Sequence, residues 1–147
     1  MLLQALGKAD ALLSFHTKGF DASEWCGQEI GFALGRGIPV VPIMVDVPPG
    51  GFVGALQAGK WKADDAKAVA GTIFNTLAQY QEAAKQLGDA LSRELKFAGS
   101  WDRAFFLVQC LNACGPLSDD AMRSVRLAQA VNDQAVGSIE GSGLLAP

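Results

Sequence analysis

Charge and histidine are both scarce in this sequence. Only 18% of the 147 residues are charged, the net charge is −3, and His16 is the single histidine. Because neither half of the chain is basic, nucleic acid and anionic membrane surfaces are poor candidates for its main partner. No cysteine or aspartate lies at a catalytic spacing from His16, so we expect a loop or packing role for this residue. Half of the residues are apolar, which allows a sizeable core and argues against global disorder.

Cysteines and long apolar runs are also few. The three cysteines, Cys26, Cys110 and Cys114, are an odd number and fall inside helical patterns, which favours buried, reduced thiols. Cys110 and Cys114 are four residues apart but have no further ligands near them, so no metal site is expected. No segment is long enough to span a membrane, and the first residues lack the pattern of a signal peptide. The sequence therefore predicts a cytoplasmic protein.

Residues 21–46 contain the clearest local signals in the chain. Ser23 suits a helix N-cap, and the adjacent Glu24 suits the positive end of the helix dipole. Gly35 and Gly37 supply the end of that helix. The residues that follow, Ile38 to Asp46, are mostly aliphatic with one charge at the end, as in a strand that is covered on both faces. A helix that leads directly into such a strand indicates a parallel α/β sheet.

Shorter elements flank this helix and strand. Residues 10–15 (DALLSF) predict a strand, and residues 16–22 predict the loop that leads to the helix. The Pro-Pro-Gly-Gly sequence after the second strand predicts a turn. Residues 55–61 are a weak candidate for a third, short strand because Gly59 interrupts them.

The remainder of the chain has helical patterns. A long helix is predicted to begin at Asp64 or Asp65, with an apolar seam at alternating steps of four and three that ends before Gly99. The seam consists of Ile73, Leu77, Tyr80, Ala84, Leu87 and Leu91. Two further helices are predicted at Trp101–Ala113 and from Ser118 to about Val136, followed by a flexible tail. The sequence thus predicts an α/β part, residues 1–80, a helical appendage, residues 81–138, and a tail, residues 139–147.

Trp25 and Glu29 are the candidate site residues. They are four residues apart and so share a face of the predicted helix, near the carboxyl end of the strand at residues 10–15. This spacing alone is weak support for a function. The wider pattern Ser23-x-Trp25-Cys26-x-x-Glu29, followed by GFALGRGIPVVPI, resembles the Toll/interleukin-1 receptor (TIR) domain family, and most of all its bacterial members. The resemblance covers about residues 1–80.

The resemblance implies a partial flavodoxin-like parallel sheet and a hydrolase activity on NAD. Many members of the family cleave the bond between nicotinamide and ribose, and their essential glutamate corresponds to Glu29. The resemblance places Trp25 and Ser23 beside the substrate, with NAD as substrate and no bound cofactor. One carboxylate suits this chemistry, because the cationic nicotinamide leaves as a neutral group and the remaining ribose cation needs a fixed negative charge. A role in bacterial defence or signal transduction is implied, as is self-association with other TIR domains.

The chain departs from the family in its N-terminal part. The family's first strand, first two helices, second strand and following loop have no counterpart in these residues, so we expect an N-terminally truncated domain. Two classes of function stay open. One is an NAD glycohydrolase, with ADP-ribose or a cyclic form as product. The other is a non-catalytic TIR–TIR interaction scaffold, or an inactive fragment. We also expect the strand at residues 10–15 to be an unpaired edge, so that the isolated chain associates and does not cleave NAD.

Overall fold

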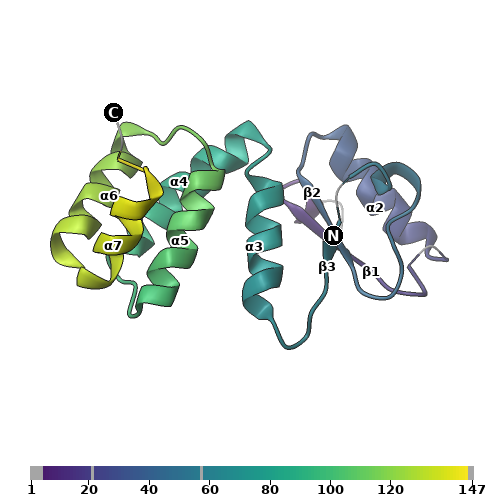
Figure 1. The fold of residues 1–147 in the computed structure, drawn as a ribbon. Coiled ribbons are helices and arrows are strands. Elements are labelled where there is room, and N and C mark those ends of the chain that lie inside the picture. Colours follow the sequence, from purple (N-terminus) through teal and green to yellow (C-terminus); the bar gives the residue numbers. More distant parts are fainter. Residues whose placement is uncertain (1–4, 21, 57, 146–147) are drawn as a thin grey trace. The chain divides into compact units, whose positions relative to one another are not determined.

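The computed structural model describes residues 5–20, 22–56 and 58–145 (Figure 1). The chain divides into two compact units, Met1–Leu77 (unit 1) and Ala78–Pro147 (unit 2). Each unit has its own buried residues, and we describe the two separately. The sequence had placed this division three residues later, after residue 80.

Unit 1 is an α/β structure built on a parallel sheet. In its described residues the sheet has three strands in the order β1–β2–β3, namely β1 (Leu12–His16), β2 (Val40–Met44) and β3 (Gly59–Lys60). The register of β1 and β2 runs from Leu12 opposite Val40 to His16 opposite Met44. The 3-10 helix η1 (Gly51–Val53) lies between β2 and β3 in the chain. The predicted parallel α/β class is confirmed, and the weak candidate strand near Gly59 exists, although it is only two residues long.

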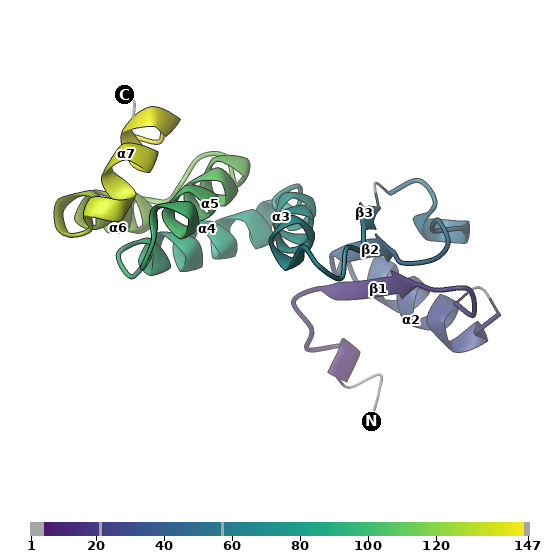
Figure 2. The same cartoon turned by 60° about the horizontal axis from the view of Figure 1, so that its bottom comes forward.

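Helices α2 (Glu24–Gly35) and α3 (Ala66–Leu77) cover opposite faces of this sheet. Ile30 and Ala33 of α2 pack with Val40, whereas Val69 of α3 packs with Val41. Because neighbouring residues of a strand point to opposite faces, the two helices lie on different sides, as Figures 1 and 2 show. The first four residues of β2, Val40 to Ile43, are therefore all buried, as the sequence predicted.

The start and end of α2 follow the predicted signals. The Ser23 hydroxyl accepts a hydrogen bond from the backbone N–H of Cys26 at 3.4 Å. At the other end Gly37 has a φ of +69°, in the left-handed region, and the N–H of Ile38 donates to the carbonyl of Ala33 at 2.9 Å. This C-terminal turn redirects the chain into β2 within a few residues.

The single long helix predicted from Asp64 to Gly99 is wrong. Helix α3 ends at Leu77, and α4 (Gln81–Leu95) begins after Tyr80, whose backbone is extended at φ −98° and ψ 116°. The predicted seam is divided between the units: Ile73 and Leu77 pack on the sheet of unit 1, whereas Leu91 is buried in unit 2. A regular spacing of apolar residues therefore arose here from two helices that serve different cores.

In the part of unit 2 that the structure describes, α4 is followed by three further helices: α5 (Trp101–Ala113), α6 (Asp119–Val131) and α7 (Asp133–Ser142). Helix α5 has the predicted bounds, and Ser118 caps α6 as predicted, with its hydroxyl accepting from the N–H of Ala121 at 3.1 Å. The predicted helix from Ser118 to Val136 is in fact broken at Asn132. Helix α7 also occupies much of the expected tail, because Ala135 and Ile139 are fully buried and hold it against α5 and α6.

The Asn132 side chain joins the end of α4 to the start of α7 in unit 2. Its side-chain nitrogen lies 3.2 Å from the carbonyl oxygens of Leu95 and Lys96 and 3.0 Å from that of Ala98, just past the end of α4. Its side-chain oxygen accepts from the N–H of Gln134 at 3.0 Å and caps α7. One amide thereby satisfies backbone groups that would otherwise lack partners at the end of α4 and the start of α7.

We expect Asn132→Ala to destabilise unit 2 by about 2–3 kcal/mol, because it removes the cap of α7 and the donors to the α4 carbonyls. Asn132→Asp keeps a cap acceptor but places a carboxylate beside carbonyl oxygens, so we expect a comparable loss. Urea denaturation followed by circular dichroism measures both variants. Asn112→Ala, at an exposed position of α5, is the control and should not lower stability, since alanine favours helices. An Asn132→Ala variant as stable as this control would contradict the role of the amide.

Helix α3 approaches β3 closely enough to require glycine there. A Cβ atom built on Gly59 would lie 2.4 Å from Cγ2 of Thr72 and 3.2 Å from its Cβ. We therefore expect Gly59→Ala to cost about 1–3 kcal/mol of unfolding free energy through this overlap. Thr72→Ser removes Cγ2 and keeps the hydroxyl that donates to the carbonyl of Ala68, so the double variant should recover most of the loss.

The control for Gly59 is Gly31→Ala in α2, where an added Cβ meets no atom within 4 Å. This change should be neutral or stabilise the protein by about 0.5–1 kcal/mol, since alanine favours helices. Thermal or urea melts compare the natural chain with Gly59→Ala, with the Gly59→Ala/Thr72→Ser double variant and with Gly31→Ala. If Thr72→Ser failed to rescue Gly59→Ala, the close approach of α3 to β3 would be wrong.

Candidate functional site

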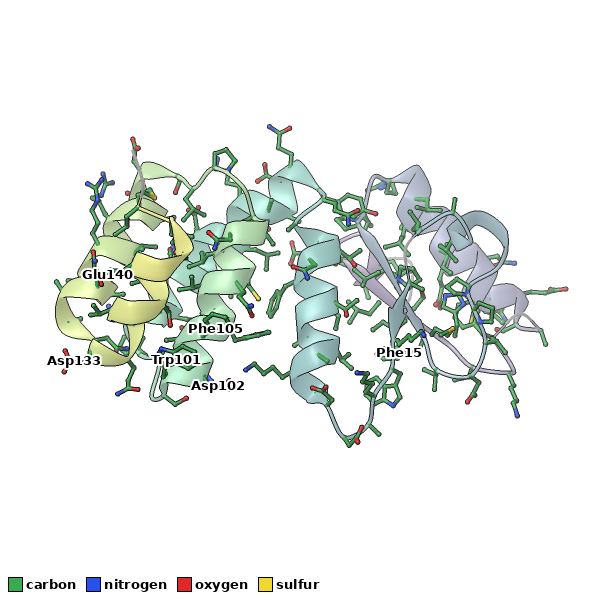
Figure 3. The ribbon with its side chains drawn as sticks, in the orientation of Figure 1. Phe15, Trp101, Asp102, Phe105, Asp133 and Glu140 are labelled. Atoms are coloured by element: carbon green, nitrogen blue, oxygen red, sulfur yellow. The ribbon has the colours of Figure 1, made fainter. Side chains whose placement is uncertain are left out.

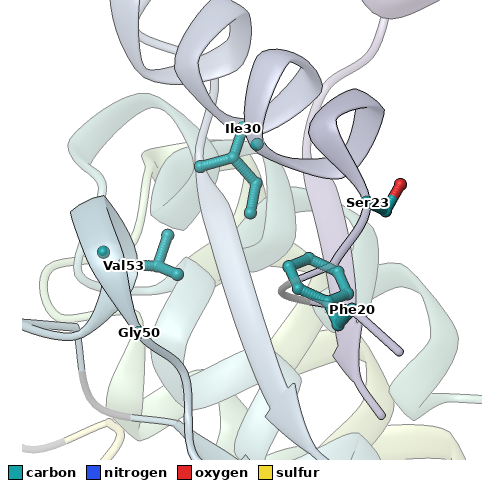
Figure 4. Close-up of a pocket in the computed structure, with 7 residues that line it drawn as sticks. Phe20, Ser23, Ile30, Gly50 and Val53 are labelled. Atoms are coloured by element: carbon teal, nitrogen blue, oxygen red, sulfur yellow. The ribbon is translucent and has the colours of Figure 1, made fainter. Parts of the chain in front are cut away.

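A small pocket lies between the first half of α2 and the loop that contains η1 (Figure 4). Its volume is about 130 Å³. Helix α2 contributes Gly27 and Ile30, with Ser23 at its N-cap. The opposite wall comes from the loop after β2, and Phe20 closes the side next to β1. The loop residues are Gly50, Gly51 and Val53.

The loop is held against α2 by apolar packing and by turn geometry. Val53 is buried and packs in one cluster with Ile30, Ala33 and Val40. Gly51 has a φ of +54°, a conformation that side chains with a Cβ rarely adopt, and its carbonyl accepts from the N–H of Gly54 at 3.3 Å. The Pro-Pro-Gly-Gly turn predicted from the sequence is thus the wall of the pocket.

The size of this pocket limits what it can bind. Sites for whole small-molecule ligands enclose roughly 300–1,000 Å³. A volume of about 130 Å³ suits one ring or a group of similar size. A Cβ added at Gly27 would meet no atom within 4 Å, so there is open space beside this residue. The pocket therefore has room for one group of a ligand and not for a complete dinucleotide.

The three predicted site residues are not brought together in one place. Ser23 lines the pocket and caps α2. Trp25 is 70% exposed, and Glu29 is half-buried in the second turn of the helix. Neither Trp25 nor Glu29 lines the pocket. Each is two residues away from Gly27 in the chain, which corresponds to roughly 200° around a helix, so both lie on another side of α2. The helix thus presents a pocket on one side and the Trp25–Glu29 pair on another.

Sequence reasoning did not find the pocket, although part of its signal was present. Phe20 and Val53 come from loops that have no periodic pattern of their own. The glycine-rich turn after β2 was the one usable sign, because glycines allow a backbone to approach a helix or a ligand closely.

His16 is completely buried at the carboxyl end of β1. Its Nε2 lies 3.1 Å from the hydroxyl of Ser14, and its ring packs on that of Phe20 with the ring centres 4.1 Å apart. Its backbone carbonyl accepts from the N–H groups of Val45, Asp46 and Val47. These contacts fit the packing role that the sequence indicated, with the difference that His16 ends a strand and does not lie in a loop.

Unit 2 has a wider hollow of about 620 Å³ between the start of α4 and the turn from α5 to α6. Glu82 and Lys85 of α4 line one side, and Cys114, Pro116 and Leu117 line the other. The Cys114 thiol donates to the carbonyl of Cys110 at 3.3 Å. Burial raises the pKa of both thiols, and for Cys110 the pKa reaches about 11, to which the charge of a Cys114 thiolate also contributes. Neither cysteine is a ready nucleophile at neutral pH.

No match was found when the chain was compared with protein families, with curated proteins and with solved structures. Among the described residues, no three His, Cys, Asp or Glu side chains lie close enough to hold a metal ion. In the same part of the chain, no helix combines the length and apolar character needed to cross a bilayer.

The raised thiol pKa values lead to a test of reactivity. We expect half-buried Cys26 to react with a disulfide reagent at pH 8 well before Cys110 and Cys114, which should react only on unfolding. Cys26→Ser should abolish the fast phase. Rapid modification of three thiols in the native protein would contradict this assignment.

The raised pKa of Cys110 also predicts how stability depends on pH. Since unfolded Cys110 ionises near its ordinary pKa of 9.0 and the folded thiol near 11, its stabilising contribution is complete below pH 9 and is lost between pH 9 and 11.

Proposed function

We propose that unit 1 is the C-terminal part of a TIR-like domain that cleaves NAD between nicotinamide and ribose, with Glu29 as the essential carboxylate. The observation that carries the proposal is the chain order β1–α2–β2–η1–β3–α3 around a parallel sheet, with the Ser23-x-Trp25-Cys26-x-x-Glu29 motif at the start of α2. This order agrees with the arrangement that the motif predicts for the family. In open α/β sheets ligands bind at the carboxyl ends of the strands, where α2 begins.

The half-buried position of Glu29 suits the proposed chemistry. The bond between the ribose C1′ and the nicotinamide nitrogen breaks, and its electron pair leaves with the neutral nicotinamide. The ribose is left as a cation, which the Glu29 carboxylate stabilises while it orients the ribose hydroxyls. Water then adds its oxygen to C1′ and releases a proton, which gives ADP-ribose; attack by another atom of the same molecule gives a cyclic product.

The positions of Trp25 and Glu29 define the proposed binding surface. The exposed indole of Trp25 lies one turn before Glu29 on the same side of α2, where it can stack on a base or on the nicotinamide ring. The pocket at Ser23 and Gly27 lies on a different side of the helix. We therefore assign substrate binding to the Trp25–Glu29 side, and the pocket at most to one small group of the ligand.

The second candidate function is a scaffold that associates with other chains. The observation that favours it is an exposed apolar surface on unit 1, where Leu13, Phe15 and Trp61 are each more than a third exposed. Monomeric proteins rarely leave such side chains clustered on a surface without a partner. In this alternative Glu29 has no catalytic role.

The Glu29 proposal predicts the effect of one isosteric change. Expression in bacteria of the natural reading frame that contains this chain should deplete cellular NAD, and Glu29→Gln should abolish the depletion. The change removes the negative charge while it keeps the size and helix propensity of the side chain. Glu24→Gln, an exposed glutamate in the first turn of the same helix, is the matched control and should retain full activity.

The outcomes of this assay separate the two candidates. NAD depletion that persists in Glu29→Gln would contradict the catalytic assignment. If neither the natural protein nor Glu24→Gln depleted NAD, the enzyme proposal would be wrong and the scaffold would remain.

A further inference from the structure

Two aromatic side chains lie exposed on α5 of unit 2. The rings of Trp101 and Phe105, one helical turn apart, stack with their centres 5.1 Å apart and their planes 11° apart. Trp101 is 55% exposed and Phe105 37%. A Cβ built on Gly137 of α7 would lie 4.0 Å from Nε1 of Trp101, so the indole lies beside this glycine. The ring pair therefore has a defined position next to α7.

Two carboxylates of α7 lie on either side of that glycine. Asp133 precedes Gly137 by four residues and Glu140 follows it by three, so the three residues share one face of the helix. Both carboxylates are exposed (Figure 3). Among the described residues neither forms an ion pair, and Glu140 accepts a hydrogen bond from the side-chain amide of Gln129 at 3.4 Å. The Trp101 indole is thus placed beside α7 between two negative charges.

The basic residue of α5 lies on another side of that helix. A Cβ built on Gly88 of α4 would lie 3.9 Å from Cβ of Cys114, so the Cys114 side of α5 faces α4. Arg103 precedes Cys114 by eleven residues, which is about three helical turns, so it shares that side. Trp101 is two residues from Arg103 and so roughly 200° around the helix. Helix α7 itself contains no lysine or arginine.

We propose that Trp101, Phe105, Asp133 and Glu140 form a docking surface for a basic segment of a partner protein, with an arginine side chain stacked on the indole. A guanidinium is planar and stacks on aromatic rings, and indole is the aromatic group that attracts cations most strongly. The carboxylates can pair with the N–H groups of that guanidinium or of a neighbouring basic side chain. This inference concerns unit 2 and is independent of NAD cleavage.

Charge favours this occupant over others. Nucleic acid, anionic lipid and acidic peptides all have the same sign as Asp133 and Glu140, and like charges brought together at an interface are repulsive. The net charge of this chain is −3, so a second copy is repelled on average as well. Tryptophan and arginine are also the side chains that most often dominate the binding energy of protein interfaces.

Peptides of matched length test the class of partner. A capped peptide of alternating arginine and glycine is titrated into the ¹⁵N-labelled 147-residue chain, and the indole N–H signals are followed by NMR. The Trp101 signal, identified by its loss in Trp101→Leu, should shift, whereas those of Trp25 and Trp61 should not. The same peptide with lysine should bind about threefold to tenfold more weakly, because an ammonium group does not stack. The peptide with glutamate should not bind, and salt should weaken the arginine complex.

Variants of the surface test its parts by calorimetry with the arginine peptide. Trp101→Leu should weaken binding about tenfold or more, and Asp133→Asn and Glu140→Gln about threefold each. Asp119→Asn is the matched control for Asp133, since each aspartate directly follows the N-cap residue of its helix. Trp61→Leu is the control for loss of an exposed indole. Both controls should bind as the natural chain does, and circular dichroism checks that every variant is folded.

Three results would overturn the proposal: a Trp101 signal that the arginine peptide does not shift, a glutamate peptide that binds equally well, or a folded Trp101→Leu with unchanged affinity. The lysine comparison and Glu140→Gln keep the test valid if Trp101→Leu does not fold, because equal affinities in both would also contradict the surface. A chain that dimerises in sedimentation and loses the dimer in Glu140→Lys would assign this surface to a second copy instead.

Discussion

The packing of α2 on β2 is the contact on which unit 1 depends. Ile30 and Ala33 meet Val40, and Val53 of the following loop joins the same cluster. Since Gly37 turns the chain directly from α2 into β2, this contact is local in sequence and costs little loop entropy. The same packing holds the start of α2 at the carboxyl end of β1, and it fixes the wall of the pocket opposite Gly27. The core packing therefore determines the geometry of the candidate site.

In unit 2 polar groups at helix ends define where several helices start and stop. Helices α5, α6 and α7 begin with side-chain caps at Ser100, Ser118 and Asn132, and the hydroxyl of Ser118 also donates to the carboxylate of Asp89 on α4. Such caps fix where one helix stops and the next starts, while the buried aliphatic residues supply most of the stabilisation. The stacked rings of Trp101 and Phe105 remain exposed on α5, with the ring centres 5.1 Å apart (Figure 3).

Sequence reasoning predicted the elements whose signals are local. Ser23 and Ser118 marked helix starts correctly because a cap acts within three residues, and the strand at Val40 was evident from its continuous apolar composition. The apolar seam from Ile73 to Leu91 led to the wrong prediction of one long helix. Periodicity indicates which residues are buried, but it does not indicate in which core they are buried. Asn132 was missed because its role depends on carbonyls more than thirty residues earlier in the chain. The pocket depends in the same way on a contact between α2 and a distant loop.

Pro42 in the middle of β2 has a consequence for how the sheet can grow. Because Val41 and Ile43 direct their backbone groups to β1, the nitrogen of Pro42 faces the β3 side, where it has no hydrogen to donate. The pairing of β3 begins only beyond it, at Ile43 opposite Gly59. The sheet thus tapers to a two-residue strand on that margin, which gives an incoming strand very little to bind.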